Sequence, residues 1–482
     1  MKLLRITSIG FFPKHMYFIS ILAPIFISFL LYKFTFNFFF FQDDFFHLRI
    51  SKAENFNELL NFFKFRNDII GYRPVTIQFY FSLLYGLFKL NPLVFRIFNF
   101  LIFIGSFFLI IETVYLISKK KIIGLITASL WILSSIHFMT LTWISASYQL
   151  IGTFFWLLTS QFFLKFVEKS KVIYYLLSLG AFFLTIFSFE FSVTWPVIFF
   201  TYFFLVLRNE FIKSIKIFSP FIVVTIFYLI LRYLFKEVPQ IEDYRFQINI
   251  NSFKAFFWYF LWALNVPEEF KYQIINNLVL LNKKFLSDFW LLTIKSYIGV
   301  VLIIVLGIIV PIIKSIRSKL ELNLRLIIFA NIWFIIGIAP VLVIPKHTFL
   351  MYLTLPSIGI YLLIAYLVVK LRNIKLIFAL FVVWIFTSIT TLTFYKNHSY
   401  MNEAQKFSKQ FYYQIKNKFP SVQPSSIIFY PLTNKTHIQA LSNQNAIKVI
   451  YNDLSIEIYF NEDDLKKRLI QDKKNYKVFK YQ

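Results

Sequence analysis

Two adjacent aspartates, Asp43 and Asp44, come directly after a long apolar run and carry the first candidate chemistry of the sequence. At the outer end of a membrane span, a carboxylate meets both water and lipid headgroups, so it could take a proton from a hydroxyl group there. Neighbouring residues diverge by about 100° on a helix and point to opposite faces of a strand. We therefore expect one aspartate to act and the other to orient it, bind a metal ion or cap a helix. A plain N-cap or a solvated turn is the alternative for the pair.

Cationic residues on the same predicted side of the membrane could bind an anionic headgroup. Arg73 precedes Pro74, which suits the first turn of a helix, and the free amide groups of such a turn together with a guanidinium form a phosphate site. A side chain that snorkels to the membrane surface is the alternative for Arg73. Lys346 and His347 occupy a short outer loop and would supply further contacts to the phosphate.

A third acid, Glu190, lies in a very short turn between two apolar runs. Placing a carboxylate deeper in the membrane would cost about 2.5–3.5 kcal/mol, so an acid in such a position is either functional or an interfacial anchor. Other chemistry is excluded by what the sequence lacks. There is no cysteine for thiol catalysis or thiolate metal ligation, and no glycine-rich motif for the phosphates of a soluble nucleotide.

The elements that must position these residues are membrane helices. The chain has 482 residues, of which 58% are hydrophobic and only 15% are charged. Runs of about 18 or more apolar residues can cross a hydrocarbon core as helices, which satisfy their own backbone in lipid. We count eleven runs, at residues 16–41, 92–118, 122–142, 148–166, 172–188, 191–207, 217–235, 292–313, 326–344, 349–369 and 374–394. The sequence thus predicts an all-α polytopic membrane protein with about eleven transmembrane helices.

Lysine and arginine gather in every second connection, as in 119–121 and 314–325, whereas the short turns at 143–147 and 188–190 have neither. Because basic loops stay in the cytoplasm, this alternation predicts a cytoplasmic N-terminus and an extracytoplasmic C-terminus. The same loops explain most of the net charge of +27 without a nucleic-acid partner.

Three segments are predicted to lie outside the membrane core. Residues 42–91 form an outer loop with the two aspartates and an interfacial helix from Pro74, and residues 236–291 form a second outer loop. Residues 396–482 are predicted to be a small extracytoplasmic α/β domain, with strands at 426–430, 447–451 and 455–460 and helices near 400–417 and 463–471. The catalytic transmembrane domain would then be residues 1–395.

The order of several short motifs resembles a known family. These motifs are Gln42-Asp43-Asp44-Phe45, Tyr72-Arg73-Pro74-Val75-Thr76, Leu90-Asn91-Pro92 with Phe95-Arg96 and Asn99, Ile136-His137 with Thr142-Trp143-Ile144-Ser145, Phe189-Glu190 with Pro196, and Tyr352-Leu353 with Pro356-Ser357-Ile358-Gly359. They are similar to those of the GT-C membrane glycosyltransferases, in particular the protein O-mannosyltransferase-like and tetratricopeptide-carrying mannosyltransferase branches.

The resemblance implies transfer of a sugar from a polyprenyl-phosphate donor to a glycan, lipid or protein acceptor at the extracytoplasmic face, with inversion. It implies that Asp43 or Asp44 is the general base, and since the first acid of such a pair is the usual one, we expect Asp43 as the base and Asp44 as its orienter or a metal ligand. We expect Glu190 to be a further catalytic residue, and Arg73, Lys346 and His347 to contact the donor phosphate. The protein would lie among the lipids of a bacterial inner membrane. No cofactor is identified, and a divalent metal ion is left open. The alternative function is a non-enzymatic transporter or flippase of a lipid-linked glycan, which would bind its cargo near the membrane midplane.

Overall fold

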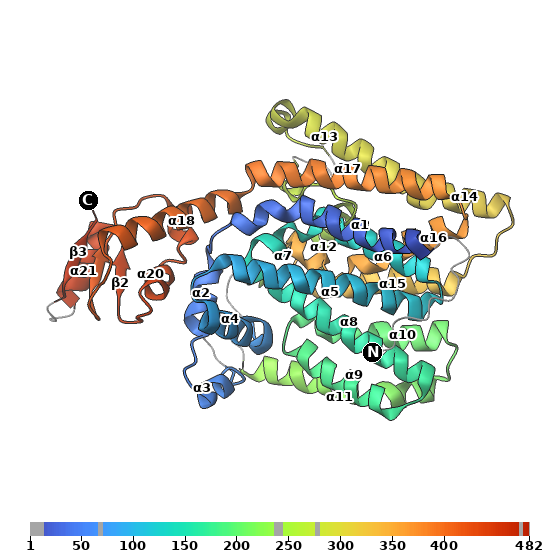
Figure 1. Ribbon diagram of the computed structural model, residues 1–482, viewed down its shortest axis with the longest axis horizontal. Helices are drawn as coiled ribbons and strands as arrows, with labels where there is room; N and C mark the ends of the chain where they lie inside the picture. Colours follow the sequence, from blue (N-terminus) through green and yellow to red (C-terminus); the bar gives the residue numbers. More distant parts are fainter. Residues whose placement is uncertain (1–13, 66–70, 236–243, 275–279, 472–475, 482) are drawn as a thin grey trace. The chain divides into compact units, whose positions relative to one another are not determined.

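The computed structural model describes residues 14–65, 71–235, 244–274, 280–471 and 476–481, and most of them are helical (Figure 1). The chain divides into two compact units. The first, which we call the helical unit, comprises described residues of the segments 1–33, 100–139 and 149–395. The second, the loop-tail unit, comprises those of the segments 34–99, 140–148 and 396–482. The predicted outer loop 42–91 and the C-terminal tail therefore share one compact unit.

The helical unit consists of α-helices joined by shorter helical turns. Its elements are α1 (Lys14–Tyr32), α6 (Lys121–Ile132), η3 (Ser135–His137), α9 (Val172–Ile186), η5 (Glu190–Thr194), α10 (Trp195–Thr201), η6 (Tyr202–Val206), α11 (Phe211–Phe235), α12 (Ile250–Ala263), η8 (Glu268–Gln273), α13 (Lys283–Ile304), η9 (Val305–Ile309), α14 (Val310–Arg317), α15 (Leu324–Leu342), η10 (Leu350–Leu353), α16 (Ser357–Lys370) and α17 (Ile374–His398). The helices that continue from one unit into the other are α5 (Pro92–Ser118), α7 (Phe138–Thr142), α8 (Ser147–Lys169) and, with its last residues, α17.

The number of membrane-spanning helices is smaller than the predicted eleven. Seven helices in the described residues are long and apolar enough to span a membrane, or eight if the pair Lys121–Ile132 and Ser135–Thr142, bent by 50°, is one broken span. The seven are Phe18–Asn37, Pro92–Ser118, Ile144–Lys169, Phe211–Leu234, Lys283–Arg317, Leu324–Leu342 and Ile374–His398. The remaining three predicted runs form the shorter apolar helices Val172–Ile186, Glu190–Val206 and Ser357–Lys370. The protein is thus a helical polytopic membrane protein, but the count of eleven spans is corrected.

Helix α16 shows why an apolar run need not be a span. It has 14 residues, so its length is about 21 Å at 1.5 Å per residue, short of a hydrocarbon core of about 30 Å. Nearly all of its side chains are buried against protein, mainly α6 and α15. Gly359 packs so tightly on α15 that an added Cβ would lie 2.5 Å from the carbonyl oxygen of Ala330. The hydrophobicity of α16 therefore serves the protein core.

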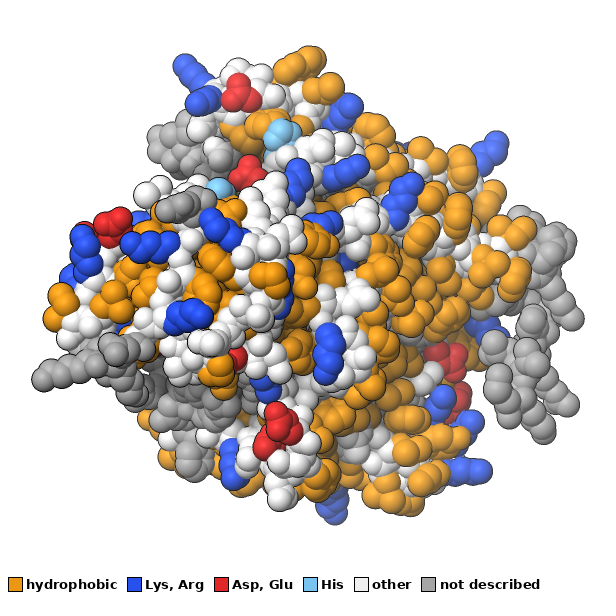
Figure 2. Space-filling model, turned by 60° about the vertical axis from the view of Figure 1, so that its left-hand side comes forward, with side chains coloured by type: hydrophobic (Ala, Val, Ile, Leu, Met, Phe, Trp, Pro, Cys, Tyr) orange, Lys and Arg blue, Asp and Glu red, His pale blue; other side chains and the backbone are white. Residues whose placement is uncertain are grey.

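Other helices keep large apolar side chains at the surface. On α11, Val223, Phe227 and Leu234 are each more than 60% exposed, and Trp290 and Val301 of α13 are more than half exposed. Figure 2 shows hydrophobic side chains gathered over a broad part of one face, with lysines and arginines at separate points. A soluble surface rarely carries apolar patches of this extent, whereas lipid covers them at no cost, which agrees with an integral membrane protein.

The loop-tail unit combines short helices with one small sheet. Its elements are η1 (Lys33–Asn37), α2 (Asp43–Ile50), α3 (Phe56–Asn61), η2 (Pro74–Phe79), α4 (Tyr80–Phe88), η4 (Ile144–Ala146), α18 (Tyr400–Lys418), β1 (Ile427–Phe429), α19 (Lys435–Ala440), α20 (Asn445–Ile450), β2 (Glu457–Tyr459), α21 (Glu462–Gln471) and β3 (Val478–Lys480). The predicted helix from Pro74 is present as η2 and α4, with Pro74 in its first turn.

The three strands are parallel in the order β2-β1-β3, with Ile428 opposite both Ile458 and Phe479. Two of the predicted strands and both predicted helices of the tail are confirmed. The predicted strand 447–451 is wrong, because these residues fall largely in helix α20. Strand β3 was not predicted.

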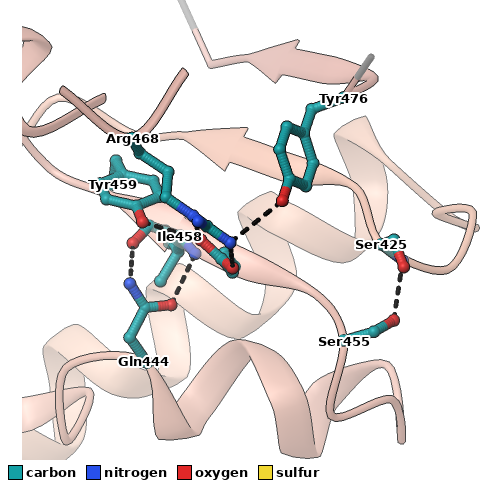
Figure 3. A network of polar contacts seen from close by, with 8 residues as sticks. Ser425, Gln444, Ser455, Ile458, Tyr459, Arg468 and Tyr476 are labelled. Carbon is teal, nitrogen blue, oxygen red and sulfur yellow. Dashed lines mark hydrogen bonds and ion pairs between the residues drawn. The ribbon is translucent and has the colours of Figure 1, made fainter. Parts of the chain in front are cut away.

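Side chains of the tail fix the edge strand β2 in place (Figure 3). Arg468 of α21 forms a two-pronged contact with Glu457, at 3.0 Å from Nε and 2.8 Å from one terminal nitrogen, and also donates to the hydroxyl of Tyr476 at 3.0 Å. The side-chain oxygen of Gln444 accepts from the backbone N–H of Ile458 at 2.7 Å, and its amide nitrogen donates to the carbonyl of the same residue. These contacts hold β2 to α21 and to the residue before α20.

Candidate functional site

Helix α2 begins at the first of the two aspartates, so both carboxylates lie in its first turn. Carboxylates are favoured there because the first amide groups of a helix lack partners within it. The preceding residue, Gln42, has φ 51° and ψ −125°, a conformation that costs a residue with a side chain about 1–3 kcal/mol. This sharp turn separates the end of the first span from α2, and the two aspartates then diverge.

Asp44 is completely buried, and both of its carboxylate oxygens are in use. One oxygen accepts from the backbone N–H and the hydroxyl of Ser145, each at 2.7 Å, and the other from the backbone N–H of Phe41 at 3.1 Å. Burial raises the pKa of Asp44 to about 7, although the bonds from Ser145 and the charge of Arg96 lower it. Asp44 thus ties α2 to η4, a segment about a hundred residues later, and is closed to a ligand.

Asp43 has the opposite environment, because its side chain is exposed. Protein atoms nevertheless crowd the carboxyl, and this loss of water raises the pKa of Asp43 above its ordinary value. The positive charge of Arg73 acts in the other direction and lowers that pKa in part. An accessible carboxylate with a raised pKa beside a guanidinium can accept a proton from a hydroxyl group.

Arg73 is held by its neighbours at the entry to η2. Its guanidinium carbon lies 3.6 Å from the centre of the Tyr148 ring, a cation–π arrangement. Gly71 has φ +113°, and a Cβ there would come within 3.3 Å of the guanidinium carbon. A glycine is needed at this position both for the backbone and for the arginine beside it. Arg73 therefore presents a fixed positive charge near Asp43.

His47 is a member of this cluster that the sequence reasoning missed. It follows Asp43 by four residues on α2, and this spacing places two side chains on one face of a helix. The imidazole is only 9% exposed and packs on Phe81, with 5.3 Å between ring centres. Burial and the charge of Arg73 lower the pKa of His47 to about 3, so the ring is neutral near pH 7. Its Nδ1 has no hydrogen-bond partner among the described residues.

Arg96, part of the motif that carries the family resemblance, has a structural role. It is 2% exposed, and its guanidinium donates to the carbonyls of Phe38 at 2.9 Å, Phe39 at 3.2 Å, Leu141 at 3.3 Å and Thr142 at 2.6 Å. These bonds join the segment that leads into α2 with the segment that leads into η4. Arg96 and Asp44 thus fix the same two segments.

The structure places Glu190 in the helical unit, at the start of η5. There its carboxylate forms an ion pair with Arg232 of α11, at 2.9 Å, and both side chains are partly buried. An acid engaged in this way is held as an anchor between η5 and α11. The predicted catalytic role of Glu190 stays a prediction.

Lys346 and His347 also belong to the helical unit. The His347 ring lies 4.2 Å from that of Tyr244 and 4.7 Å from that of Phe349, measured between ring centres. Their contact with a donor phosphate stays a prediction. The residue after His347, Thr348, accepts a hydrogen bond from Lys271 through its hydroxyl. The sequence patterns did not indicate Lys271 as a candidate.

Two acids accompany Lys271 on η8. Burial and the neighbouring carboxylate raise the pKa of Glu268 to about 8, and burial raises that of Glu269 to about 7. Burial lowers the pKa of Lys271 to about 8. One oxygen of Glu268 accepts from the backbone N–H of Leu350 at 3.2 Å, so this group holds the loop before η10 in place.

The donor set for a divalent metal ion is incomplete. Within the described ranges, no three side chains of histidine, aspartate or glutamate lie together as a metal site requires. Asp44 is closed by its three hydrogen bonds, which leaves Asp43 as the accessible acid of the pair. The described side chains therefore do not form a site for a resident metal ion.

Comparison with known proteins adds no relative: no protein-family model matches the chain, and no curated protein matches it.

Proposed function

We propose that the protein is a GT-C-type membrane glycosyltransferase that moves a sugar from a polyprenyl phosphate to an acceptor hydroxyl at the extracytoplasmic face. The observation that carries this proposal is the arrangement of Asp43 and Arg73: one accessible carboxylate, with a raised pKa, beside a guanidinium fixed on Tyr148. A displacement at an anomeric carbon needs these two charges, one for the proton of the attacking hydroxyl and one for the leaving phosphate. The sequence motifs around both residues resemble that family.

The proposed reaction is a single inverting displacement. Asp43 takes the proton from the acceptor hydroxyl as the hydroxyl oxygen attacks the anomeric carbon of the donor sugar. The bond from that carbon to the phosphate oxygen breaks, and its electron pair leaves with the polyprenyl phosphate, which gains negative charge. The guanidinium of Arg73 stabilises this charge. A new glycosidic bond and a protonated Asp43 result, and the proton then passes to water.

His47 completes the proposed donor site. Its imidazole is neutral and its Nδ1 is buried without a partner among the described residues, so this nitrogen would form a hydrogen bond with the donor once binding opens this face of α2. Its position one helical turn after Asp43 places this contact next to the reacting groups.

Replacement of Arg73 by alanine should raise the KM for the donor and move the acidic limb of the pH profile. The charge of Arg73 lowers the pKa of Asp43, so its removal disfavours the carboxylate and raises that pKa. The fall of kcat/KM on acidification should therefore start at a higher pH in Arg73→Ala than in the wild type.

Arg73→Lys should restore the pH profile but only part of the donor affinity, because lysine lacks the planar fork that binds phosphate. Steady-state kinetics between about pH 5 and pH 8 measure both effects, and an unchanged KM with an unchanged limb would contradict the role of Arg73.

The function itself is tested by incubating the purified protein in detergent or liposomes with a panel of polyprenyl-phosphate sugars and simple hydroxyl acceptors. We expect transfer of one sugar with inversion at the anomeric carbon, detected by mass spectrometry and NMR. If none of the donors is consumed but a lipid-linked glycan crosses the membrane of sealed liposomes, the protein is a transporter and the proposal is wrong.

Insertion in a bacterial inner membrane with the tail outside is also part of the proposal, and it rests on the basic loops. The chain has no cysteine, so single cysteines report topology cleanly. Lys467→Cys, at an exposed site of the tail, should react with an impermeant maleimide in intact cells, whereas Lys120→Cys, also exposed, should react only after lysis. The reverse pattern would place the candidate site in the cytoplasm.

A further inference from the structure

The C-terminal tail holds the segment that leads into Asp43. The tail belongs to the same compact unit as residues 34–99, and α20 of the tail packs directly on α2. The backbone N–H of Gln42, the residue that precedes the aspartates, donates to the carbonyl of Ala440 at 2.8 Å. Ala440 is the last residue of α19, where a helix leaves carbonyl groups without partners of its own.

Two buried polar side chains of α18 complete this contact. The hydroxyl of Ser408 donates to the same carbonyl of Ala440 at 2.9 Å. The side-chain oxygen of Gln405 accepts from the backbone N–H of Phe39 at 3.2 Å, and its nitrogen donates to Asn402 within α18. Ser408 is 0% exposed and Gln405 is 6% exposed, so both bonds are shielded from water. A buried polar group that loses its partner is destabilising, so these bonds fix the chain on both sides of Phe41.

Further contacts also join the tail to the segments on either side of α2. The ring of Tyr412 lies 5.2 Å from that of Phe39, and the hydroxyl of Tyr85 donates to the side chain of Asn452 at 3.3 Å. Lys52, shortly after α2, is close enough to Asp453 for their charges to interact. The tail thus contacts the outer loop before α2, after α2 and on α4.

We propose that the tail positions the catalytic aspartate, with Gln405 and Ser408 as its positioning residues. This inference rests on the proposed role of Asp43. The strained turn at Gln42 sets where α2 starts, and the bond to Ala440 holds that turn. Loss of these contacts lets the start of α2 relax, and a shift of about 1 Å in a reacting group can lower a rate by about 10²-fold. The tail then acts on kcat without touching the substrate.

The test compares variants that change one contact each in the full-length protein. Gln405→Leu removes the acceptor for the backbone N–H of Phe39. Ser408→Ala removes the second donor to Ala440. Ser426→Ala is the matched control, because Ser426 is a tail serine that is 1% exposed and whose hydroxyl has no partner in the described part of the chain.

Amide hydrogen exchange provides a readout independent of activity. We expect faster exchange in peptides covering residues 38–46 for Gln405→Leu and Ser408→Ala, with little change elsewhere. We expect kcat to fall by about 10-fold or more with the donor KM nearly unchanged, together with a shifted acidic limb, since Asp43 moves relative to Arg73. Ser426→Ala should match the wild type in both exchange and rate.

Two results would overturn the inference: unchanged exchange at 38–46 in both variants, or faster exchange there with an unchanged kcat and pH profile. Both leave the proposed function standing. If the wild type transfers no sugar, the proposed function fails instead, while the exchange data still decide whether the tail holds this segment.

Discussion

Replacement of Asp43 by asparagine should lower turnover by about 10²-fold or more, the usual contribution of a positioned general base. Asparagine keeps the size of the side chain and its place in the first turn of α2 but cannot accept the proton of the acceptor hydroxyl. The residue is exposed and the substitution keeps its size, so the fold and the donor KM should change little. Activity of the wild type should also fall as the pH drops through the raised pKa of Asp43, because protonation removes the base, and the asparagine variant should lack this limb.

Asp463→Asn is the matched control for this experiment. Asp463 is also an exposed aspartate in the first turn of a helix of the same unit, α21, but it is remote in sequence from every candidate site residue. The Asp463→Asn variant should keep the full turnover of the wild type. Near-normal turnover in a well-folded Asp43→Asn variant would require the glycosyltransferase mechanism placed at this residue to be abandoned.

Hydropathy predicted where the apolar helices lie but overestimated how many span the membrane. A window of apolar residues looks the same whether lipid or protein surrounds it. Only packing shows that α16 is enclosed, with Trp131 donating to the carbonyl of Thr354 at 2.7 Å and Tyr361 to that of Ala263 at 2.9 Å. These pairs are far apart in the sequence. The apolar run at 349–369 is long enough to span, and only the structure shows that its helix has 14 residues.

Local pattern also failed at α20, where β-branched residues suggested a strand. Ile447, Val449 and Ile450 are all buried, and with Ala446 they cover one side of a short helix that packs on α2. The β-propensity of such residues mostly reflects how they pack, so tertiary contact decided the outcome. Strand β3 was missed because its pairing with β1 depends on a partner about fifty residues earlier.

The sequence could predict the residues of single motifs in the candidate site, but not the contacts between motifs that are distant in the chain. The divergence of neighbouring residues indicated that Asp43 and Asp44 would have different surroundings, and one is exposed while the other is buried. The i,i+4 spacing could have selected His47. Nothing local could reveal that Ser145 and Phe41 occupy both oxygens of Asp44, since the first of these contacts bridges a hundred residues.

The structure changes what we expect of Asp44. Asp44→Asn should lower the free energy of unfolding by about 2–4 kcal/mol, because a buried donor without an acceptor costs about 1–3 kcal/mol. An asparagine can still accept from Ser145 with its one oxygen. Its NH2 group would then face the N–H of Phe41, which leaves donors on both sides unsatisfied. Equilibrium unfolding in mixed micelles measures the change, and the yield of folded protein should fall with it.

A double-mutant cycle separates this structural role from catalysis. Ser145→Ala removes the hydroxyl but keeps the backbone N–H, so alone it should cost less than Asp44→Asn. The two changes should not be additive, because they remove parts of one network. The remaining folded Asp44→Asn protein should keep a measurable rate and the acidic limb that belongs to Asp43. If Asp44→Asn were instead as stable as the wild type and inactive, while Asp43→Asn stayed active, the catalytic role would belong to Asp44, and its burial in this structure would have to open when substrate binds.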